Sequence, residues 1–473
     1  MFDQIVIGLE VHVQLKTESK LFTGASNKVD ENVNIHCDYV SAALPGTLPV
    51  PNKMAFEKAI RACQVFGCQI NKRSNFDRKN YFYPDLPKGY QTTQLFTPIG
   101  VGGGLNININ GVDKMIRLDR IHIEEDAGKL VHDSMDSYVN LNRAGVPLVE
   151  IVTCPGLSSS QEAVLLLKKI HQQLVYHEVT VGDMEKGNFR CDANISLKKS
   201  SEKELGVRAE IKNLNSFRFL EKAIDYEVNR QRAVLSSGDL VVQETRGFDS
   251  ATGKTYSMRS KEEAEDYRYF PDPDLPSVVL EDRYVDIILD LKKEDLEVKG
   301  KRYLENYSLS PNDVDALFSD TQRINYFEEI VSKDVKGKVA CNWLLNVILS
   351  FGEIDYFKRE FSTENLVKVI GLVEQSLLNQ AQARKVISFM IEDKVDDVGG
   401  AVKALGFVQV ADVSQVAQWV DEVIAQNPSQ IKEFTSGKVK LKGYLVGQVI
   451  KLSKGKVNPK LASEILLDKL KEN

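Results

Sequence analysis

Apolar and polar positions alternate along the first strand-like segment of the chain. In residues 4–15, QIVIGLEVHVQL, every second position from Ile5 to Leu15 is apolar. Side chains of a β-strand point alternately to its two faces, so Glu10 and His12 fall together on the opposite face. The pattern predicts a strand with one buried face and one face that carries ionisable groups.

The same alternation recurs in two later segments. RCDANISL sets Arg190 and Asp192 opposite its apolar residues, and VRAEIKN does the same with Arg208, Glu210 and Lys212. A solvated sheet face normally carries loose mixtures of Thr, Ser, Lys and Glu, whereas this face gathers carboxylates, a histidine and arginines. Such groups bind metal ions and phosphates, so the pattern favours a catalytic sheet face.

Helical periodicity is scattered at first and dominates the second half of the chain. Irregularly spaced strands and helices favour an α+β fold with a mainly antiparallel sheet. The three early helices are predicted over residues 54–66, over residues 161–176 and between Ser216 and Gly238. From about residue 291 the pattern is helical, and Gly399 and Gly400 interrupt it. We therefore expect three domains, at residues 1–290, 291–405 and 406–473.

Composition limits the class of protein. A chain of 473 residues is too long for one hydrophobic core, and its 42% hydrophobic and 27% charged content is ordinary for a globular protein. The apolar runs are far shorter than a membrane span, so no membrane partner is expected. The start of the chain shows no basic or Arg/Ser-rich presequence, which predicts a cytoplasmic protein. The six cysteines form no CxxC pair, which favours reduced thiols over disulfides or zinc.

Charge is unevenly distributed along the chain. The net charge of −6 argues against general nucleic-acid binding. The segment from Ser436 onward departs from that average, because it carries seven lysines and no acid over 25 residues: Lys438, Lys440, Lys442, Lys451, Lys454, Lys456 and Lys460. Two interpretations stay open, a solvated pair of lysine-rich helices and a phosphate-contacting surface confined to one small module.

Acidic and imidazole side chains are candidate ligands for a divalent cation. Glu10 and His12 lie about 7 Å apart along one strand, so both reach one ion. The segment IHIEEDAG adds Glu124 and Glu125, for which a solvated acidic turn is the alternative. Glu150 lies among apolar neighbours in VPLVEIV and needs a cation or a hydrogen-bond network there. Oxygen ligands with one imidazole fit Mg²⁺ or Mn²⁺ better than zinc.

Other motifs are weaker or point to structure. GFDSATGKT has one residue too many for a phosphate-binding loop and predicts a hairpin turn. The serines at 158–160 predict a helix N-cap rather than a nucleophile. The loop at residues 76–94 clusters cations and tyrosines, among them Lys79, Tyr81 and Lys88. A structural role is open for this loop, but its composition favours contact with a nucleotide, a phosphate or the 3′ end of an RNA.

Several strings resemble one known family. GLEVHVQL, DRKNYFYPDLPKGYQ, IHIEEDAGK, LNRAGVPLVEIV, RCDANISL, EIKNLNSF and DYRYFPDPDLP resemble the B subunit of the tRNA-dependent amidotransferases, and LVGQVIKLSKGKVNP resembles the tail domain of that family. The likeness covers essentially the whole chain. It implies an antiparallel-sheet cradle domain similar to the glutamine synthetase core, an all-helical domain and a small helical tail domain that binds tRNA.

The resemblance also implies a reaction. The family amidates Glu-tRNA(Gln), Asp-tRNA(Asn) or both, with an A subunit that releases ammonia from glutamine and a C subunit that braces the pair. The B subunit uses ATP and Mg²⁺ to phosphorylate the side-chain carboxylate, because a carboxylate is a poor acyl donor and its oxygen must leave as phosphate. The tail lysines then fit contact with the body of the mischarged tRNA.

Residue roles follow from the resemblance. The expected metal ligands are Glu10, His12, Glu124, Glu125 and Glu150. The expected catalytic residues are Glu10, Glu125, Arg190, Asp192, Arg208, Glu210 and Lys212. The residues expected to line the nucleotide site or the ammonia path are Lys79, Tyr81 and Lys88. Three positions depart from the common family pattern and bear on loop contacts and substrate preference: Asn140, Cys154 and Gly156.

Two competing functions remain open at the level of sequence. A free-standing, glutamine synthetase-like ligase for a small amino acid needs no remote RNA-binding module, so the lysine-rich tail argues against it. A non-catalytic tRNA-binding scaffold predicts that Glu125→Gln leaves ATP-dependent phosphorylation intact and tRNA affinity normal. The catalytic interpretation, with Glu125 as a ligand by resemblance, predicts lost phosphorylation with retained tRNA binding.

Overall fold

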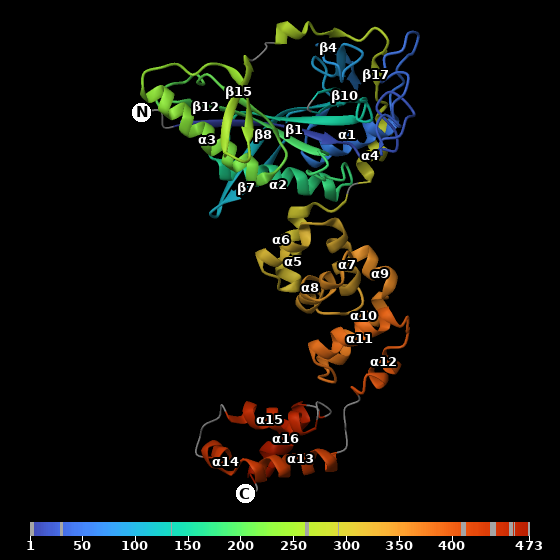
Figure 1. The fold of residues 1–473 in the computed structure, drawn as a ribbon, viewed down its shortest axis with the longest axis vertical. Coiled ribbons are helices and arrows are strands. Elements are labelled where there is room, and N and C mark those ends of the chain that lie inside the picture. Colours follow the sequence, from blue (N-terminus) through green and yellow to red (C-terminus); the bar gives the residue numbers. More distant parts are fainter. Residues whose placement is uncertain are drawn as a thin grey trace. The chain divides into compact units, whose positions relative to one another are not determined.

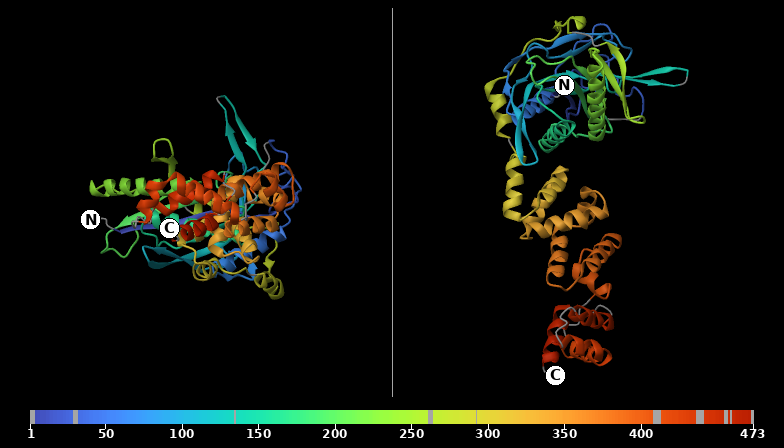
Figure 2. Two further views of the ribbon diagram at one scale, coloured as in Figure 1. Left: turned by 90° about the horizontal axis from the view of Figure 1, so that it is seen from below. Right: turned by 90° about the vertical axis from the view of Figure 1, so that its left-hand side faces the viewer.

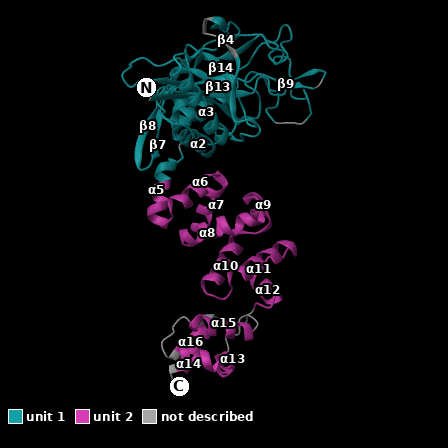
Figure 3. Ribbon diagram, turned by 60° about the vertical axis from the view of Figure 1, so that its left-hand side comes forward, with its two compact units in different colours: residues 1–299 teal, residues 300–473 magenta. Residues whose placement is uncertain are grey.

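The chain separates into two compact units, residues 1–299 and 300–473 (Figure 3). The structure is a computed structural model. It describes residues 4–28, 32–133, 135–260, 264–291, 293–407, 413–435, 441–453, 457 and 459–471. The first unit contains a large sheet covered by helices, and the described part of the second unit is helical (Figure 1). The predicted α+β class is therefore confirmed.

Ten strands of the first unit form one sheet, in the order β15-β14-β13-β12-β1-β11-β8-β6-β2, with β7 paired to β8. Their bounds are β1 (Gln4–Gln14), β2 (Gln69–Ile70), β6 (Gly100–Val101), β7 (Gly104–Ile109), β8 (Val112–Glu125), β11 (Pro147–Thr153), β12 (Phe189–Lys198), β13 (Ala209–Leu214), β14 (Glu244–Asp249) and β15 (Lys254–Ser260). All pairs are antiparallel except β13 with β14. The mainly antiparallel sheet is confirmed, and β14 with β15 forms the hairpin predicted around GFDSATGKT.

Three smaller sheets complete the first unit. They pair β3 (Arg73–Ser74) with β17 (Val278–Val279), β4 (Asp77–Asn80) with β5 (Tyr90–Thr93) and β16 (Phe270–Pro271), and β9 (Lys129–His132) with β10 (Ser137–Asn140). The proline-rich segment at residues 270–279 thus returns to the loop at residues 76–94.

Helices cover one face of the main sheet, as the turned views also show (Figure 2). They are α1 (Lys53–Val65), α2 (Ser160–Tyr176) and α3 (Phe217–Ser236), with α4 (Asp282–Asp290) packed on α1. The Ser159 side chain accepts a hydrogen bond from the Glu162 amide, so the predicted N-cap is confirmed. Ile7, Leu9 and Val11 of β1 are fully buried beneath these helices. The apolar positions of the alternating pattern therefore form the core.

The second unit is a succession of short helices. They are α5 (Leu296–Tyr307), which begins in the first unit, α6 (Pro311–Phe318), α7 (Thr321–Val331), α8 (Gly337–Asn346), α9 (Ile354–Glu360), α10 (Thr363–Glu374), α11 (Gln380–Glu392), α12 (Val398–Ala404), α13 (Val413–Gln426), α14 (Pro428–Thr435), α15 (Leu441–Leu452) and α16 (Pro459–Lys471). Val416 of α13, Leu445 of α15 and Leu466 of α16 share one hydrophobic cluster. Among the described residues no helix is both long enough and apolar enough to span a membrane.

Candidate functional site

The face of the main sheet opposite the helices carries the ionisable side chains. In the register of the central strands, Glu10 pairs with Asp192, and His12 pairs with Glu150 on one side and Arg190 on the other. The alternation that buries the apolar residues of β1 therefore aligns these five groups across β11, β1 and β12. Strand pairing brings together residues that are far apart in the sequence.

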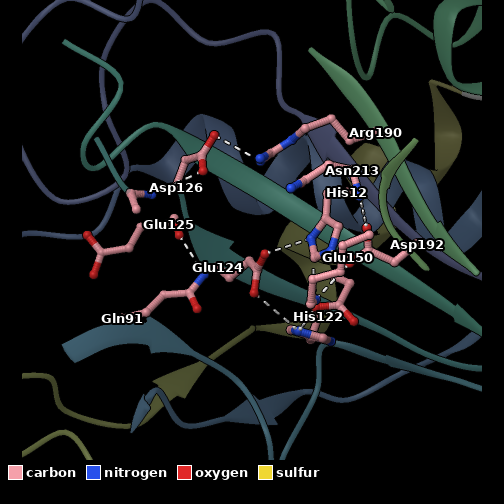
Figure 4. Close-up of polar contacts among 12 residues, drawn as sticks. His12, Gln91, His122, Glu124, Glu125, Asp126, Glu150, Arg190, Asp192 and Asn213 are labelled. Carbon is pink, nitrogen blue, oxygen red and sulfur yellow. Dashed lines mark hydrogen bonds and ion pairs between the residues drawn. The ribbon is translucent and has the colours of Figure 1, made fainter. Parts of the chain in front are cut away.

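One group of potential ligand atoms centres on His12. The Nδ1 atom of His12 lies 3.0 Å from Glu124 Oε1 and 3.9 Å from Glu150 Oε2 (Figure 4). His122 approaches the same carboxylates, with its Nε2 atom 3.3 Å from Glu150 Oε2 and 3.7 Å from Glu124 Oε2. Ligand atoms of His12, Glu124 and Glu150 all lie within 4.8 Å of one another. We call these three residues the histidine group.

Charges of the histidine group and of the adjacent His122 compensate one another, with two imidazoles facing two carboxylates. Burial disfavours the imidazolium forms, but Glu150 and Glu124 outweigh it, so the pKa of His122 rises to about 9 and the pKa of His12 lies well above its usual value. Burial likewise disfavours the carboxylates, yet the two imidazoles hold the pKa of Glu150 at about 2. Two bound protons carry the same total charge as one divalent cation, and the donor set of imidazole and carboxylate oxygens fits Mg²⁺ or Mn²⁺.

A second group lies on the neighbouring strands. Ligand atoms of Glu10, Asp192 and Glu210 also lie within 4.8 Å of one another, and we call these residues the carboxylate group. The Nζ atom of Lys212 lies 2.9 Å from Asp192 Oδ2 and 3.0 Å from Glu210 Oε1. Asn194 donates a hydrogen bond of 2.9 Å to Glu10 Oε1. The group therefore holds three acids around one ammonium.

The carboxylates of this group differ in their electrostatic balance. Burial opposes ionisation of Asp192, but Lys212 and His12 hold the pKa of that carboxyl far below its usual range. The pKa of Glu10 is raised instead, by burial and by the charges of Glu150, Glu210 and Asp192. Glu10 thus lies where additional positive charge would be strongly favoured.

His12 connects the two groups through its two ring nitrogens. Nδ1 faces the histidine group, while Nε2 lies 3.8 Å from Asp192 Oδ2. Both ring nitrogens of His12 therefore face carboxylates, Nδ1 those of Glu124 and Glu150 and Nε2 that of Asp192.

Glu125 belongs to neither group, although the resemblance assigns it a ligand role. It follows Glu124 at the end of β8 and points away from the histidines (Figure 4). Its side chain forms an ion pair with Lys88 and accepts a 2.9 Å hydrogen bond from the Thr92 amide. The two adjacent acids therefore have different surroundings, with Glu124 among imidazoles and Glu125 beside an ammonium.

Two cavities adjoin the polar sheet face. One, of about 860 Å³, is lined among others by Lys79, Tyr81, Asp85, Lys212 and Tyr267. The Nζ atom of Lys79 lies 4.7 Å from the Tyr267 ring centroid, so this wall combines cations and aromatic rings. Burial raises the pKa of Tyr81, which keeps its hydroxyl protonated. Of the three residues predicted for this loop, Lys79 and Tyr81 share the cavity, whereas Lys88 lies with Glu125.

The other cavity, of about 610 Å³, adjoins Glu10 of the carboxylate group. Arg120, Arg208, Asn194 and Cys154 also line it. Arg208, predicted from the alternating pattern, therefore lies at the edge of the site. Cys154 places one of the departures from the family pattern directly in this cavity.

Arg190 and its partner lie at the end of the face beyond His12. Arg190 Nη2 donates a 3.0 Å hydrogen bond to Asp126 Oδ2, and Arg143 Nε lies 3.3 Å from the same oxygen. The Asp126 charge raises the pKa of Arg190 further. Arg190 is thus already paired with Asp126. It flanks the histidine group, and it is not among the described residues that line the two cavities.

Sequence reasoning missed His122. It lies in IHIEEDAG between Ile121 and Ile123, both of which are fully buried. The same alternation that selected His12 places His122 and Glu124 on the polar face and Glu125 on the other. Alternation within IHIEEDAG is therefore the sequence signal that identifies His122.

Comparisons with known proteins identify the class and then the family. A model described as GatB/GatE catalytic domain matches residues 5–286, and one described as GatB domain matches residues 325–470. The sheet and its polar face are therefore those of an amidotransferase catalytic domain. The chain belongs to the family of aspartyl/glutamyl-tRNA(Asn/Gln) amidotransferase B subunits, as the resemblance predicts.

Relatives of this name align over nearly their full length. The subunit from Clostridium beijerinckii is 43% identical over 476 residues, with 99% of both chains covered. The subunit from Syntrophotalea carbinolica is 44% identical over 471 residues, covering 99% of this chain and 98% of the relative. The subunit from Campylobacter jejuni is 42% identical over 473 residues, with 99% of both covered.

Proposed function

We propose that this chain uses ATP to phosphorylate the side-chain carboxylate of Glu-tRNA(Gln), Asp-tRNA(Asn) or both. A carboxylate oxygen attacks the γ-phosphorus and ADP leaves; ammonia then attacks the acyl carbon and phosphate leaves with that oxygen. The observation that carries the proposal is the polar sheet face, where two compact groups of potential ligands adjoin two cavities. The family name, which specifies amidotransfer on these tRNAs, supports it.

The residues present fit divalent cations. His12, Glu124 and Glu150 would hold one ion, and Glu10, Asp192 and Glu210 would hold another. When bound, Mg²⁺ supplies positive charge between the phosphates and the substrate carboxylate. His122 and Lys212 lie beside these ligands, where they orient carboxylates and balance charge. These donors are the oxygen and imidazole atoms that Mg²⁺ or Mn²⁺ accepts.

The two cavities suit the two substrates. We assign the nucleotide to the cavity with Arg120 and Arg208, because guanidinium groups recognise phosphates well. We assign the aminoacylated 3′ end to the larger cavity, where Lys79 and Lys212 meet aromatic side chains that suit an unpaired base. The γ-phosphate and the substrate carboxylate then meet over the polar sheet face between the two cavities.

Ammonia has to reach the larger cavity, where the aminoacylated 3′ end is placed, in its uncharged form, because ammonium has no lone pair. We propose that a partner A subunit releases it from glutamine, that a C subunit braces the pair, and that the path passes near Lys88 and Tyr81. We further propose that the cradle resembles the glutamine synthetase core. Six free cysteines fit a reducing cytoplasmic location.

The decisive experiment supplies the purified complex with ATP, glutamine and each mischarged tRNA in turn. ADP formation and production of amidated aminoacyl-tRNA are measured together. We expect ADP to form only when a mischarged tRNA with a free side-chain carboxylate is present, with one amide formed per ADP. ADP formation that ignores the tRNA, or its absence with either tRNA, contradicts the proposal and favours the scaffold alternative.

We also propose that the tail binds the body of the tRNA through its lysines. Of the predicted lysines, Lys442 and Lys451 lie on α15 within the described residues, and Lys451 is exposed. Lys438, Lys440, Lys454 and Lys456, and the side chain of Lys460, lie outside what the structure describes. Removing residues 436–473 would delete α15 and α16 from a shared hydrophobic cluster, so point substitutions give a cleaner test.

Replacing Lys442 and Lys451 together by Gln is expected to raise the KM for tRNA by about tenfold. Each lost phosphate contact also makes the slope of log affinity against log salt shallower by about 0.7 to 0.9. The amidation rate as a function of tRNA concentration measures the KM, and binding of labelled tRNA between about 50 and 200 mM salt measures the slope. Replacing Lys301 and Lys385 together by Gln, two exposed lysines on α5 and α11, is the charge-matched control. An unchanged KM and slope in the double variant contradict the assignment of the tail.

A further inference from the structure

Lys212 lies within the carboxylate group and at the wall of a cavity. Its Nζ atom contacts Asp192 Oδ2 at 2.9 Å and Glu210 Oε1 at 3.0 Å. The same side chain is 31% exposed and lines the 860 Å³ cavity. One ammonium therefore has two environments within reach: on one side lie the buried acids Asp192 and Glu210 with the half-buried Glu10, and on the other lies the cavity proposed for the aminoacylated 3′ end.

We propose that Lys212 is a tethered counter-ion that alternates with a divalent cation for the carboxylate group. When the cation is absent, the ammonium holds the acids together. When the cation binds, Lys212 turns into the larger cavity and contacts the side-chain carboxylate of the aminoacylated tRNA. The inference rests on the proposed function, because it takes Glu10, Asp192 and Glu210 as ligands.

The first argument is that the ammonium and a divalent cation would use the same carboxylates. The atoms that place the three acids within 4.8 Å of one another include the carboxylates that Lys212 contacts. An ammonium and a divalent cation that share two carboxylates repel each other, and the burial of Asp192 and Glu210 weakens the screening of that repulsion. Simultaneous occupancy is therefore disfavoured, and one cation displaces the other.

The second argument is that Lys212 can move without a change of backbone. Lysine carries a compact charge on a flexible four-carbon stem, unlike the rigid fork of arginine. Lys212 and Glu210 lie on the same strand, β13, and both Asp192 and Glu210 lie on strands paired within the main sheet. Rotation of the lysine stem transfers the charge from the acids to the cavity while the ligands stay in place.

The exchange couples two binding events. In the ion-free chain Lys212 is bound to carboxylates, so its charge is unavailable to the aminoacylated tRNA. Cation binding releases the Lys212 ammonium, and the side-chain carboxylate carried by the tRNA favours the position of Lys212 in the cavity. The divalent cation and the aminoacylated tRNA are therefore expected to strengthen each other's binding.

Binding of Mn²⁺ alone to the full-length chain tests the proposal without nucleotide or tRNA. The free Mn²⁺ signal in electron paramagnetic resonance gives the number and affinity of sites. Lys212→Met is expected to tighten Mn²⁺ binding at the carboxylate group by about tenfold or more, because the competing charge is lost. Lys212→Arg keeps a cation and is expected to stay near the wild type. Adding Glu210→Gln to Lys212→Met is expected to remove the gain.

Lys88→Met is the matched control for general electrostatics. It removes a lysine that pairs with Glu125, outside the carboxylate group, and is expected to change Mn²⁺ affinity less than twofold, roughly the effect of a remote charge. An unchanged or weaker Mn²⁺ site in Lys212→Met overturns the inference and leaves the proposed function standing. A wild-type chain that binds no Mn²⁺ overturns the ion sites of the proposed function itself.

A second readout uses the unaltered chain, so it does not depend on whether the variant folds. An amine-acylating reagent is applied with and without Mn²⁺, and the labelling of Lys212 is measured by peptide mass spectrometry. We expect Mn²⁺ to increase the labelling of Lys212 severalfold and to leave Lys88 unchanged. Equal or reduced labelling of Lys212 shows that the ammonium stays with the acids, which overturns the proposal.

Discussion

Replacing Glu150 by Gln is expected to reduce ATP-dependent activation of the tRNA-borne carboxylate by about a hundredfold or more. Glu150 lies between His12 and His122, at 3.9 and 3.3 Å, and is one of three ligand candidates in the histidine group. The amide keeps the size of the side chain but removes the charge that faces both imidazoles. The tail is untouched, so tRNA affinity is expected to stay within about twofold of the wild type.

Single-turnover transfer of labelled γ-phosphate, with tRNA binding measured in parallel, separates these two effects. Glu125→Gln is the matched comparison, because Glu125 is a nearly buried acid of the same segment whose partners are Lys88 and the Thr92 amide. Mn²⁺ affinity is expected to fall in Glu150→Gln and to persist in Glu125→Gln. Equal losses in both variants would support the ligand set given by family resemblance over the grouping seen in the structure.

Local periodicity was sufficient to predict which side chains share a face. Ile7, Leu9 and Val11 are fully buried, while Glu10 and His12 lie on the polar side, as alternation requires. Side-chain direction along a strand is a local property of the backbone, so a sequence pattern contains it. The bounds predicted for α1, α2 and α3 lie within two residues of those observed, because the apolar stripe of a helix is a local feature.

The composition of each ligand group depends on strand order, which no local pattern contains. β1 pairs with β11 and β12, and these pairings bring Glu150 and Asp192 to opposite sides of His12. Alternation alone also separates Glu124 from Glu125, although the family resemblance implies a ligand role for both. The distinction follows from the end of β8, where Glu125 reaches Lys88. Pairing between strands that are distant in the sequence therefore determines which side chains lie together in each group, and composition and spacing do not contain that information.

The helix-covered side of the sheet contains a buried ionic network that is expected to be critical for stability. Glu227 of α3 is fully buried and accepts hydrogen bonds from Arg230 at 2.6 and 2.9 Å and from Gln231 at 2.9 Å. Thr255 of β15 donates to it at 3.1 Å, and Arg246 of β14 lies 3.3 Å away. The carboxylate therefore ties the helix to the two strands beyond β13.

Glu227→Ala is expected to destabilise the first unit by about 3 to 5 kcal/mol, because it leaves the buried Arg246 without one of its two acids. Arg230→Ala removes the more exposed partner of the network and is expected to cost about 1 kcal/mol or less. The first variant therefore tests the buried charge, and the second tests the exposed part of the network.

Urea unfolding monitored by hydrogen exchange of peptides from α3, β14 and β15 measures this loss where it occurs. Tryptophan fluorescence supplies an internal reference, because Trp343 and Trp419 both lie in the second unit, whose transition is expected not to move. β13 pairs with β14 and carries Glu210 and Lys212, so loosening this edge is also expected to weaken the carboxylate group. A cost below about 1 kcal/mol for Glu227→Ala would mean that Glu244 alone compensates Arg246.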